Sequence, residues 1–237
     1  NYVCQIHSIR HIELRALEEG YLEEVYVDEG QFVKKGQKMF KIMPMLYEAE
    51  LKKAQAEAQV AQIEYQNAKS LADQNIISQN ELALAEAHYN KAKAEVSLAE
   101  VHLGFTVIKA PFDGIMNRLE AREGSLLEEG ELLTSLSDNS KMWVYFNVPE
   151  AEYLDFQTNA KKGNMAEVNL LMANGKVFAE TGKVETITGE FNNETGNIAF
   201  RANFPNPDGL LRHGETGSIL TKIPYKNALL IPQKATF

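Results

Sequence analysis

The chain has 237 residues, of which 44% are hydrophobic and 24% charged, and its formal net charge is −9. These values are ordinary for a globular protein of one to three domains, and a negative charge without a basic patch argues against a nucleic-acid-binding protein. No apolar run approaches the roughly 18–20 residues that a membrane helix needs, and no signal peptide is recognisable.

Motifs that carry chemistry are missing from the sequence. Cys4 is the single cysteine and cannot form an internal disulfide. We interpret it as a strand residue, because the bulky Val3 does not fit the cleavage site before a lipid-bearing cysteine. The histidines lack zinc-like spacing, and nucleophile and phosphate-loop motifs are absent. We therefore expect no enzyme activity, cofactor or metal. Because the first residues read like the interior of a strand, we expect a longer chain with any anchor outside this sequence.

Residues 12–43 have the pattern of strands joined by glycine turns. Leu22, Val25 and Val27 are spaced as in a half-buried strand, and Glu29-Gly30 is a typical turn signal. The pattern of residues 20–37 returns 94 residues later, in residues 114–131. We interpret the repeated glycines as turns: Gly20 with Gly114, Gly30 with Gly124, and Gly36 with Gly130.

The segment after the first half predicts a long helix. From Leu46 to Asn75 there is no glycine or proline, and good helix formers dominate. Its apolar residues are spaced alternately by four and three positions, as in a coiled coil. This seam contains Tyr47, Leu51, Ala54, Ala58, Ala61, Tyr65, Ala68 and Ala72.

A second helix follows a short break. Ser78 and Glu81 have the spacing of a capping box, which marks a helix start. The second seam contains Leu82, Ala85, Tyr89, Ala92, Val96, Ala99 and Leu103. If the chain folds back, facing seam residues have numbers that add to 153 or 154 in every layer. We therefore predict an antiparallel coiled-coil hairpin over residues 44–104, with arms of roughly 40 Å and a tip at 74–78.

The two glycine-containing halves, residues 12–43 and 105–138, would then fold together as one flattened sandwich. This arrangement resembles the biotinyl/lipoyl carrier fold, in which a tight turn bearing a modified lysine joins the halves. Lys41 and Lys109 do not stand in the sequence contexts that carriers use. We expect the fold to be kept as a scaffold that holds the two ends of the hairpin together.

Residues 139–227 contain about five short apolar runs and one helix signal at Pro149–Gln157, which predict a small β-barrel. We assign residues 1–11 and 228–237 to a partial membrane-proximal domain. The predicted fold is thus α+β, elongated and multidomain, with a split lipoyl-like β-sandwich, an antiparallel coiled-coil hairpin and a β-barrel.

Several stretches resemble the membrane fusion proteins, the periplasmic adaptors of tripartite resistance–nodulation–division (RND) multidrug efflux pumps. The order and spacing of these stretches along the chain are more specific than any one of them. They are GYLEEVYVDEGQFVKKGQ at 20–37, TVIKAPFDGIM at 106–116, ETGNIAFRANFPNPDGLLRHGE at 194–215 and LLIPQKA at 229–235.

The resemblance implies a non-enzymatic adaptor in the Gram-negative periplasm, associated with the inner membrane. Its implied partners are an inner-membrane proton-driven RND transporter, an outer-membrane α-barrel exit duct and further copies of itself in a trimeric or hexameric ring. The family's tip pattern is Arg, three residues, Leu, six residues, Ser. Leu71 and Ser78 fit this pattern, but Asn67 stands at the arginine position, and Lys69 is a candidate substitute.

Three alternatives remain open. The chain could serve an ATP-driven exporter, or it could be a lipoyl or biotinyl carrier. Met39, Met43 and Met45 could bind a soft metal, although methionines at such a junction more often fill a core. We expect His88 and His102 to be solvated residues at the flank of the seam. The exported compound is not predicted.

Overall fold

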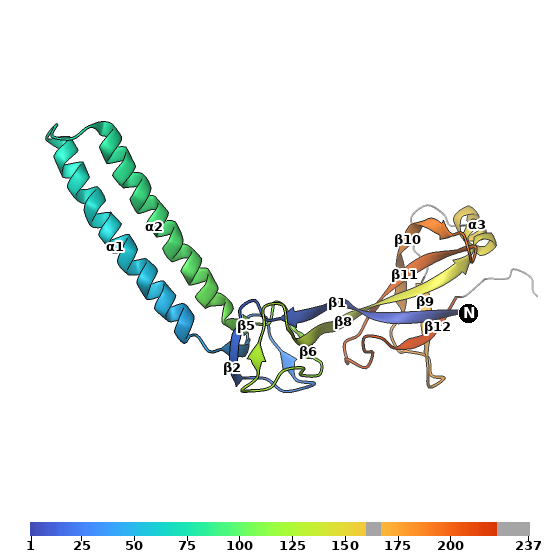
Figure 1. Ribbon diagram of the computed structural model, residues 1–237. Helices are drawn as coiled ribbons and strands as arrows, with labels where there is room; N and C mark the ends of the chain where they lie inside the picture. The colour runs from blue at the N-terminus through green and yellow to red at the C-terminus, as the bar shows by residue number, and fades with distance from the viewer. Residues whose placement is uncertain (160–166, 222–237) are drawn as a thin grey trace, which may run out of the picture. The chain divides into compact units, whose positions relative to one another are not determined.

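The structure is a computed structural model that describes residues 1–159 and 167–221. The chain divides into two compact units, Ile12–Leu136 and the combination of Asn1–His11 with Ser137–Phe237. Two long strands, β1 and β8, contribute to both units. The elements (Figure 1) are β1 (Tyr2–Arg15), β2 (Gly20–Val25), β3 (Phe32–Val33), β4 (Lys38–Ile42), α1 (Met45–Asp73), α2 (Gln79–Phe105), β5 (Val107–Lys109), β6 (Gly114–Met116), β7 (Leu126–Leu127), β8 (Leu132–Pro149), α3 (Glu150–Asn159), β9 (Glu167–Met172), β10 (Gly182–Asn192), β11 (Asn197–Pro205) and β12 (Thr216–Leu220).

The unit Ile12–Leu136 contains the sandwich. Its first sheet has the strand order β5-β4-β2-β7, and in a second set of strands β3 pairs with β6 and β6 with β8. Both halves of the repeat supply the core. Its most deeply buried side chains, each at most 1% exposed, are Ala16, Leu22, Val33, Met39, Phe40, Ile42, Met116, Leu127, Leu133 and Leu136.

The two halves exchange backbone hydrogen bonds at equivalent positions. Ala16 and Ala110 each pair with the second glycine turn of the opposite half, and Leu22 and Met116 each pair with its first glycine turn. In every case a backbone N–H donates to a backbone carbonyl, over 2.7–3.1 Å. The pairs, written donor first, are Ala16–Glu131 and Ala110–Gln37, Gly130–Ala16 and Gly36–Ala110, Leu22–Ser125 and Met116–Gln31, and Gly124–Leu22 and Gly30–Met116. Because buried backbone groups need partners, each half completes the other, which gives the sequence repeat a physical reason.

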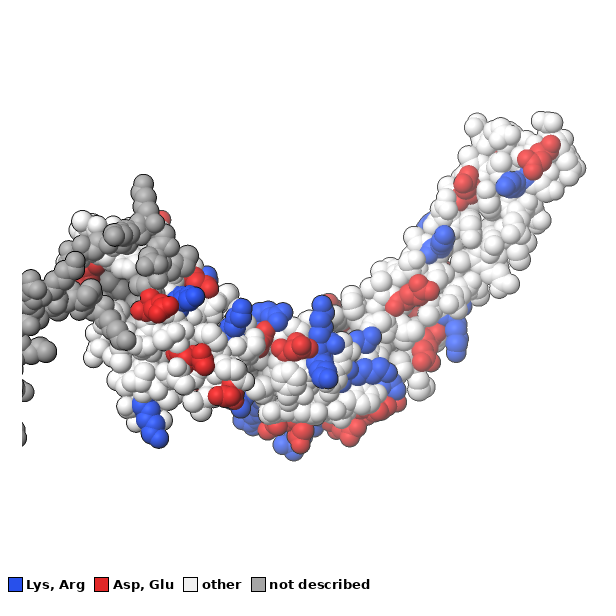
Figure 2. Space-filling view, turned by 180° about the vertical axis from the view of Figure 1, so that it is seen from behind, with Lys and Arg blue, Asp and Glu red and all other residues white. Residues whose placement is uncertain are grey.

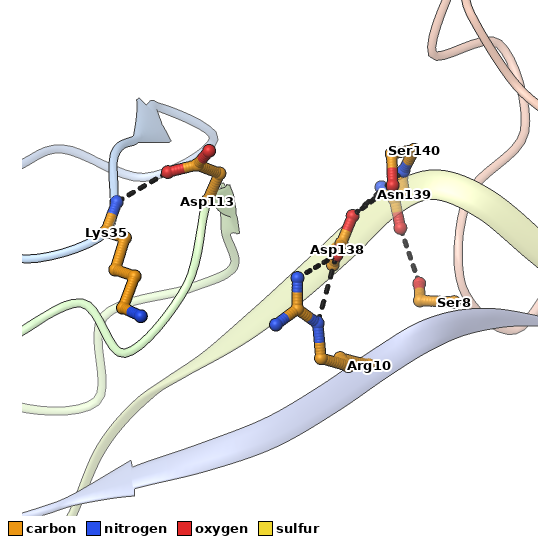
Figure 3. Close-up of polar contacts among 7 residues, drawn as sticks. All are labelled: Ser8, Arg10, Lys35, Asp113, Asp138, Asn139 and Ser140. Atoms are coloured by element: carbon orange, nitrogen blue, oxygen red, sulfur yellow. Dashed lines mark hydrogen bonds and ion pairs between the residues drawn. The ribbon is translucent and has the colours of Figure 1, made fainter.

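A side chain adds to this exchange. The N–H of Lys35 donates to Asp113 Oδ1 at 2.6 Å, again between the first and second halves (Figure 3).

Four of the six repeated glycines occupy turns. Gly30, Gly36, Gly124 and Gly130 have φ between +74° and +85°, a region that favours glycine.

The turn prediction is wrong for Gly20 and Gly114, which begin strands β2 and β6. At Gly20 the φ is +147°, and a Cβ would lie 2.8 Å from Cγ2 of Ile42, so close packing and not a turn demands glycine there. Gly114 is buried and pairs with Val33 of β3.

The segment between the halves is a helical hairpin, in which α1 and α2 lie side by side (Figure 1). The predicted α+β combination of a hairpin with β-rich domains is therefore confirmed. Within the described ranges, no helix has the length and apolarity required to cross a membrane.

The second unit is a closed sheet. Its strands follow the order β1-β12-β9-β10-β11-β8, and a further β1–β8 pairing closes the row. The helix α3 covers part of this core, since Tyr153 and Phe156 both make edge-on ring contacts with Phe200. On the outer side, the guanidinium of Arg201 lies 4.4 Å from the ring centre of Trp143.

The assignment of residues 1–11 to a membrane-proximal domain is wrong. These residues form the first part of β1, which runs antiparallel to β12 with Tyr2 opposite Ile219. Cys4 and Ile6 are each 1% exposed in the barrel core. The partner strand lies at the far end of the described chain, so local sequence does not reveal it. Residues 228–237, the other part of that prediction, and the stretch 229–235 lie outside the described residues.

Candidate functional site

The seam positions are the shielded positions of the hairpin. On α1 every seam residue is buried or half-buried and every other residue is exposed, and α2 follows the same rule apart from His102. Tyr65 and Tyr89 stack with ring centres 5.9 Å apart and planes 6° apart, in the layer that the sequence arithmetic pairs. The two helices together form a thin rod, which buries little side-chain surface: the fully buried residues of α1 and α2 are Tyr47, Ala72 and Ala92.

Two side chains fasten the base of the rod to the loop between β1 and β2. The hydroxyl of Tyr47 on α1 donates to the carbonyl of Glu19 at 2.8 Å. On α2, Nδ1 of His102 lies 2.7 Å from a carboxylate oxygen of Glu18. His102 therefore pairs with Glu18 while its side chain stays 43% exposed, and His88 is exposed as well.

At the tip, α1 ends in a Schellman motif. The N–H of Ile76 donates to the carbonyl of Leu71, and the N–H of Asn75 donates to that of Ala72, each over 2.9 Å. Asn75 has φ +58°, the left-handed conformation that this motif requires and that asparagine tolerates better than most residues. The motif satisfies carbonyls at the helix end and fixes the direction in which the chain leaves α1.

The start of α2 is fixed with equal definition. Ser78 Oγ accepts from the N–H of Glu81 at 3.2 Å, and the N–H of Ser78 donates to Glu81 Oε2 at 3.0 Å. This is the predicted capping box. Because the C-terminus of α1 and the N-terminus of α2 are both capped, the connection at residues 74–78 is a short turn with a defined backbone conformation.

Replacing Ser78 by alanine removes an N-cap acceptor, so we expect the hairpin to lose about 1 kcal/mol of stability. Ser97→Ala, at an exposed position within α2, is the matched control and should be neutral or slightly stabilising, because alanine is the better helix former. Thermal unfolding followed by circular dichroism at 222 nm measures both. Equal midpoints for the two variants would contradict the capping role.

The tip presents both apolar and polar side chains to solvent. Leu71 is 39% exposed and Ile76 62% exposed, while Asn67, Lys69 and Ser78 are exposed as well. Asn67 and Leu71, four residues apart, share a face of α1. Lys69 is offset by two residues and lies on another side, so it does not extend that face. Sequence reasoning missed Ile76, although an apolar residue between two helix-end signals could have drawn attention to it.

The three methionines do not share one environment. Met39 is fully buried in the sandwich core, while Met43 is 41% and Met45 70% exposed. Within the described ranges, no group of three or more His, Cys, Asp or Glu side chains could hold a metal ion.

Comparisons with known proteins bear on both units. The family described as "RND MFP, alpha-helical hairpin domain" matches residues 44–106, and the family "RND MFPs, beta-barrel domain" matches residues 141–223. The first match contains α1, α2 and the tip, and the second contains most of the barrel unit.

Two relatives are efflux pump components by name. The efflux pump periplasmic linker BepD of Brucella suis is 30% identical over 99% of this chain, and the toluene efflux pump periplasmic linker protein TtgD of Pseudomonas putida is 29% identical over 96%. The chain spans 65% of the length of the first and 62% of the second.

A solved structure shares the fold. The crystal structure of a MacA–MexA chimeric protein, which contains the Pseudomonas aeruginosa MexA α-hairpin domain, superimposes with a TM-score of 0.74 at 27% identity, over 91% of this chain and 78% of that one. A putative efflux transporter from Bacteroides eggerthii has the same fold, with a TM-score of 0.72 at 22% identity over 94% of this chain and 72% of that one. Together with the matched hairpin and barrel domains, these likenesses establish that the chain belongs to the membrane fusion protein family of RND efflux systems.

Proposed function

We propose that this chain is the periplasmic adaptor subunit of a tripartite efflux pump, linking an inner-membrane proton-driven transporter to an outer-membrane α-barrel exit duct. The role is mechanical and needs no catalytic group: the hairpin spans a gap, and its tip contacts the duct. Relatives named efflux pump periplasmic linkers support this reading. The same names support a periplasmic location in a Gram-negative envelope.

The observation that carries the proposal is the doubly capped tip. A contact surface that keeps its shape before binding loses little conformational entropy on binding. The Schellman motif and the capping box hold the turn between Leu71 and Ser78, and the exposed Leu71 and Ile76 supply apolar area for a partner. Asn67 offers an amide beside Leu71 where the family pattern has an arginine. Asn can donate and accept hydrogen bonds but carries no charge, so we expect this contact to depend little on salt.

The outer faces of the rod support self-association into a trimeric or hexameric ring. Leu84 and Leu98 on α2, with Val60 and Ile63 on α1, are each more than half exposed. Much of the hairpin surface in Figure 2 is uncharged. A shallow groove of about 320 Å³ lies between the two helices, where Ala61 and Ala92 line it together with charged side chains such as Glu57 and Lys91. A thin two-helix rod of this kind would bury more apolar area beside neighbouring copies.

The test is co-purification of the full-length protein from cross-linked envelopes of its own cells, with the recovered proteins identified by mass spectrometry. We expect the wild-type protein to recover an RND transporter and an exit duct. Leu71→Glu places a charge in the tip contact and should reduce duct recovery at least tenfold, with the transporter retained. The matched control is Leu126→Glu, at a 61% exposed leucine on β7 of the sandwich, which should recover both partners.

The outcomes separate the parts of the proposal. Recovery of an ATP-driven exporter in place of an RND transporter would reassign the pump class. Recovery of neither membrane partner by the wild-type protein would overturn the adaptor function. Normal duct recovery by Leu71→Glu would leave the adaptor function intact and remove the tip from it.

A further inference from the structure

Three histidine rings gather on the barrel unit. His7 and His11 lie four residues apart on β1, and His213 lies in the turn before β12. The rings of His11 and His213 stack with centres 4.1 Å apart and planes 12° apart. The ring of His7 meets His213 edge-on at 5.1 Å, and it meets Tyr145 of β8 in the same way at 5.5 Å.

Backbone hydrogen bonds place His213 between the other two rings. The N–H of Gly214 donates to the carbonyl of Ile6 at 2.9 Å, and the N–H of Ile6 donates to the carbonyl of Glu215 at 2.8 Å. The next N–H that β1 directs to this turn, that of Ser8, donates to Nδ1 of His213 at 3.2 Å. An imidazole nitrogen thus takes the place of a backbone carbonyl in the ladder between the 213–215 turn and β1.

This role demands a neutral imidazole. Nδ1 accepts a hydrogen bond when its lone pair is free, which places the ring proton on Nε2. In a protonated imidazole both nitrogens are donors, so the N–H of Ser8 would face another N–H. The new positive charge would also stack on His11 and lie beside His7. Both the hydrogen bond and the ring stack therefore oppose protonation of His213.

The charged groups around the cluster do not offset that charge. Asp138 of β8 is engaged by Arg10 of β1 through Oδ2 and by Ser140 through Oδ1 (Figure 3). Burial alone would raise the pKa of Asp138, but the hydrogen bonds from Ser140 and Arg10 outweigh it and hold this pKa below its ordinary value. On β8, His11 meets the hydroxyl of Ser137 at 2.9 Å, a neutral group. The charged residues of the turn itself, Arg212 and Glu215, flank His213 with opposite signs.

The pKa of His213 reflects the same surroundings. Burial lowers it first, and the neighbouring His11 and His7 lower it further below the ordinary value of 6.5. A histidine with a lowered pKa stays neutral at pH 7 and becomes charged within the acidic range that follows.

We propose that His213, which stacks on His11 and lies beside His7, is a pH-sensitive latch: it holds the 213–215 turn on β1 when neutral and releases it when protonated. β1 continues beyond His11 to Arg15, into the other compact unit. The latch therefore holds the turn against β1 at Ile6 and Ser8, shortly before β1 leaves the barrel unit at His11.

The sign of the pH dependence follows from linkage. His213 has a lower pKa in the folded state than in the unfolded state, so between the two values the unfolded chain binds more protons. The stabilisation is fully present above pH 6.5 and is lost as the pH falls through the folded-state value. Within that window the folding equilibrium constant should fall by up to about tenfold per pH unit.

The experiment measures the barrel at pH 7.5, 6.5, 5.5 and 5.0. NMR of the wild-type protein follows the His213 ring and the amide proton of Ser8. We expect the ring to titrate below 6.5 and the Ser8 amide to lose hydrogen-exchange protection over the same range. Urea unfolding followed by Trp143 fluorescence should show the loss of stability.

A paired variant identifies the residue responsible. In His213→Asn the side-chain Oδ1 takes roughly the position of Nδ1 and does not titrate, so the fall in stability between pH 7.5 and 5.0 should become shallower. His88→Asn, at an exposed histidine of α2, should leave it unchanged. A His213 ring that titrates at or above 6.5, or a Ser8 amide equally protected at pH 5.0 and 7.5, would overturn the latch even if His213→Asn fails to fold.

Discussion

Phe40→Ala is expected to destabilise the unit Ile12–Leu136 by about 3–5 kcal/mol, the usual cost of truncating a fully buried phenylalanine. Phe40 is 0% exposed, at the centre of β4. It stands opposite Val25 of the first half and Ile108 of the second, so the cavity would open where the two halves meet. Because α1 begins shortly after β4 ends, destabilising β4 should also destabilise the base of the hairpin, where α1 starts.

Two optical probes make the test specific to one unit. The chain has a single tryptophan, Trp143, which lies in the barrel unit, whereas circular dichroism at 222 nm is dominated by α1 and α2. Phe40→Ala should shift the urea midpoint seen by circular dichroism more than the midpoint seen by fluorescence. Phe32→Ala is the control, because Phe32 is 58% exposed on β3 and should cost well under 1 kcal/mol. A loss below 1 kcal/mol for Phe40→Ala would contradict the shared core of the two halves.

The hairpin could be predicted in detail because its determinants are local. Apolar residues spaced alternately by three and four positions predict the buried face of each helix, because that spacing matches the helix period. The Ser78–Glu81 pair predicts where the second helix starts. Both signals can be read from residues close together in the sequence. The seam then pairs Tyr65 with Tyr89, and these rings stack in the structure.

The predictions that failed depend on contacts between residues far apart in the chain. In a sequence, a glycine can indicate either a turn or a position too crowded for a side chain. At Gly20 the crowding comes from Ile42, a contact made by tertiary packing, so the local sequence does not reveal it. Residues 1–11 form a barrel strand because β12 pairs with them, and nothing in their own pattern names that partner.

The same limit applies to the functional surfaces. Asn75 gives a weaker C-cap signal than the glycine that usually occupies this position, so the Schellman motif at the tip was missed together with Ile76. The histidine cluster has no local signature, because His213 reaches His7 and His11 through the fold. Whether Leu71, Ser78, Asn67 and Lys69 contact a partner stays a prediction.

In the barrel, Gly182→Ala is expected to cost at least about 1–3 kcal/mol, the range for inserting a methyl group into a packed core. A Cβ at Gly182 would lie 2.3 Å from Cε2 of Phe204, and further ring atoms of Phe204 would lie within 2.6 Å. Phe204 is 0% exposed, so its ring has no solvent to move into, and the strand pairing of Gly182 with Val168 resists a backbone shift.

Gly189→Ala is the matched control on the same strand, since no atom lies within 4 Å of its Cβ position. Both substitutions restrict the unfolded chain alike, so the difference between them isolates the collision with Phe204. Gly182→Ala should lower the Trp143 fluorescence midpoint and leave the circular dichroism midpoint nearly unchanged, the reverse of Phe40→Ala. If either variant shifted both midpoints by the same amount, the two units would unfold in one cooperative transition. The two units, divided at His11 and Ser137, would then have no separate stabilities.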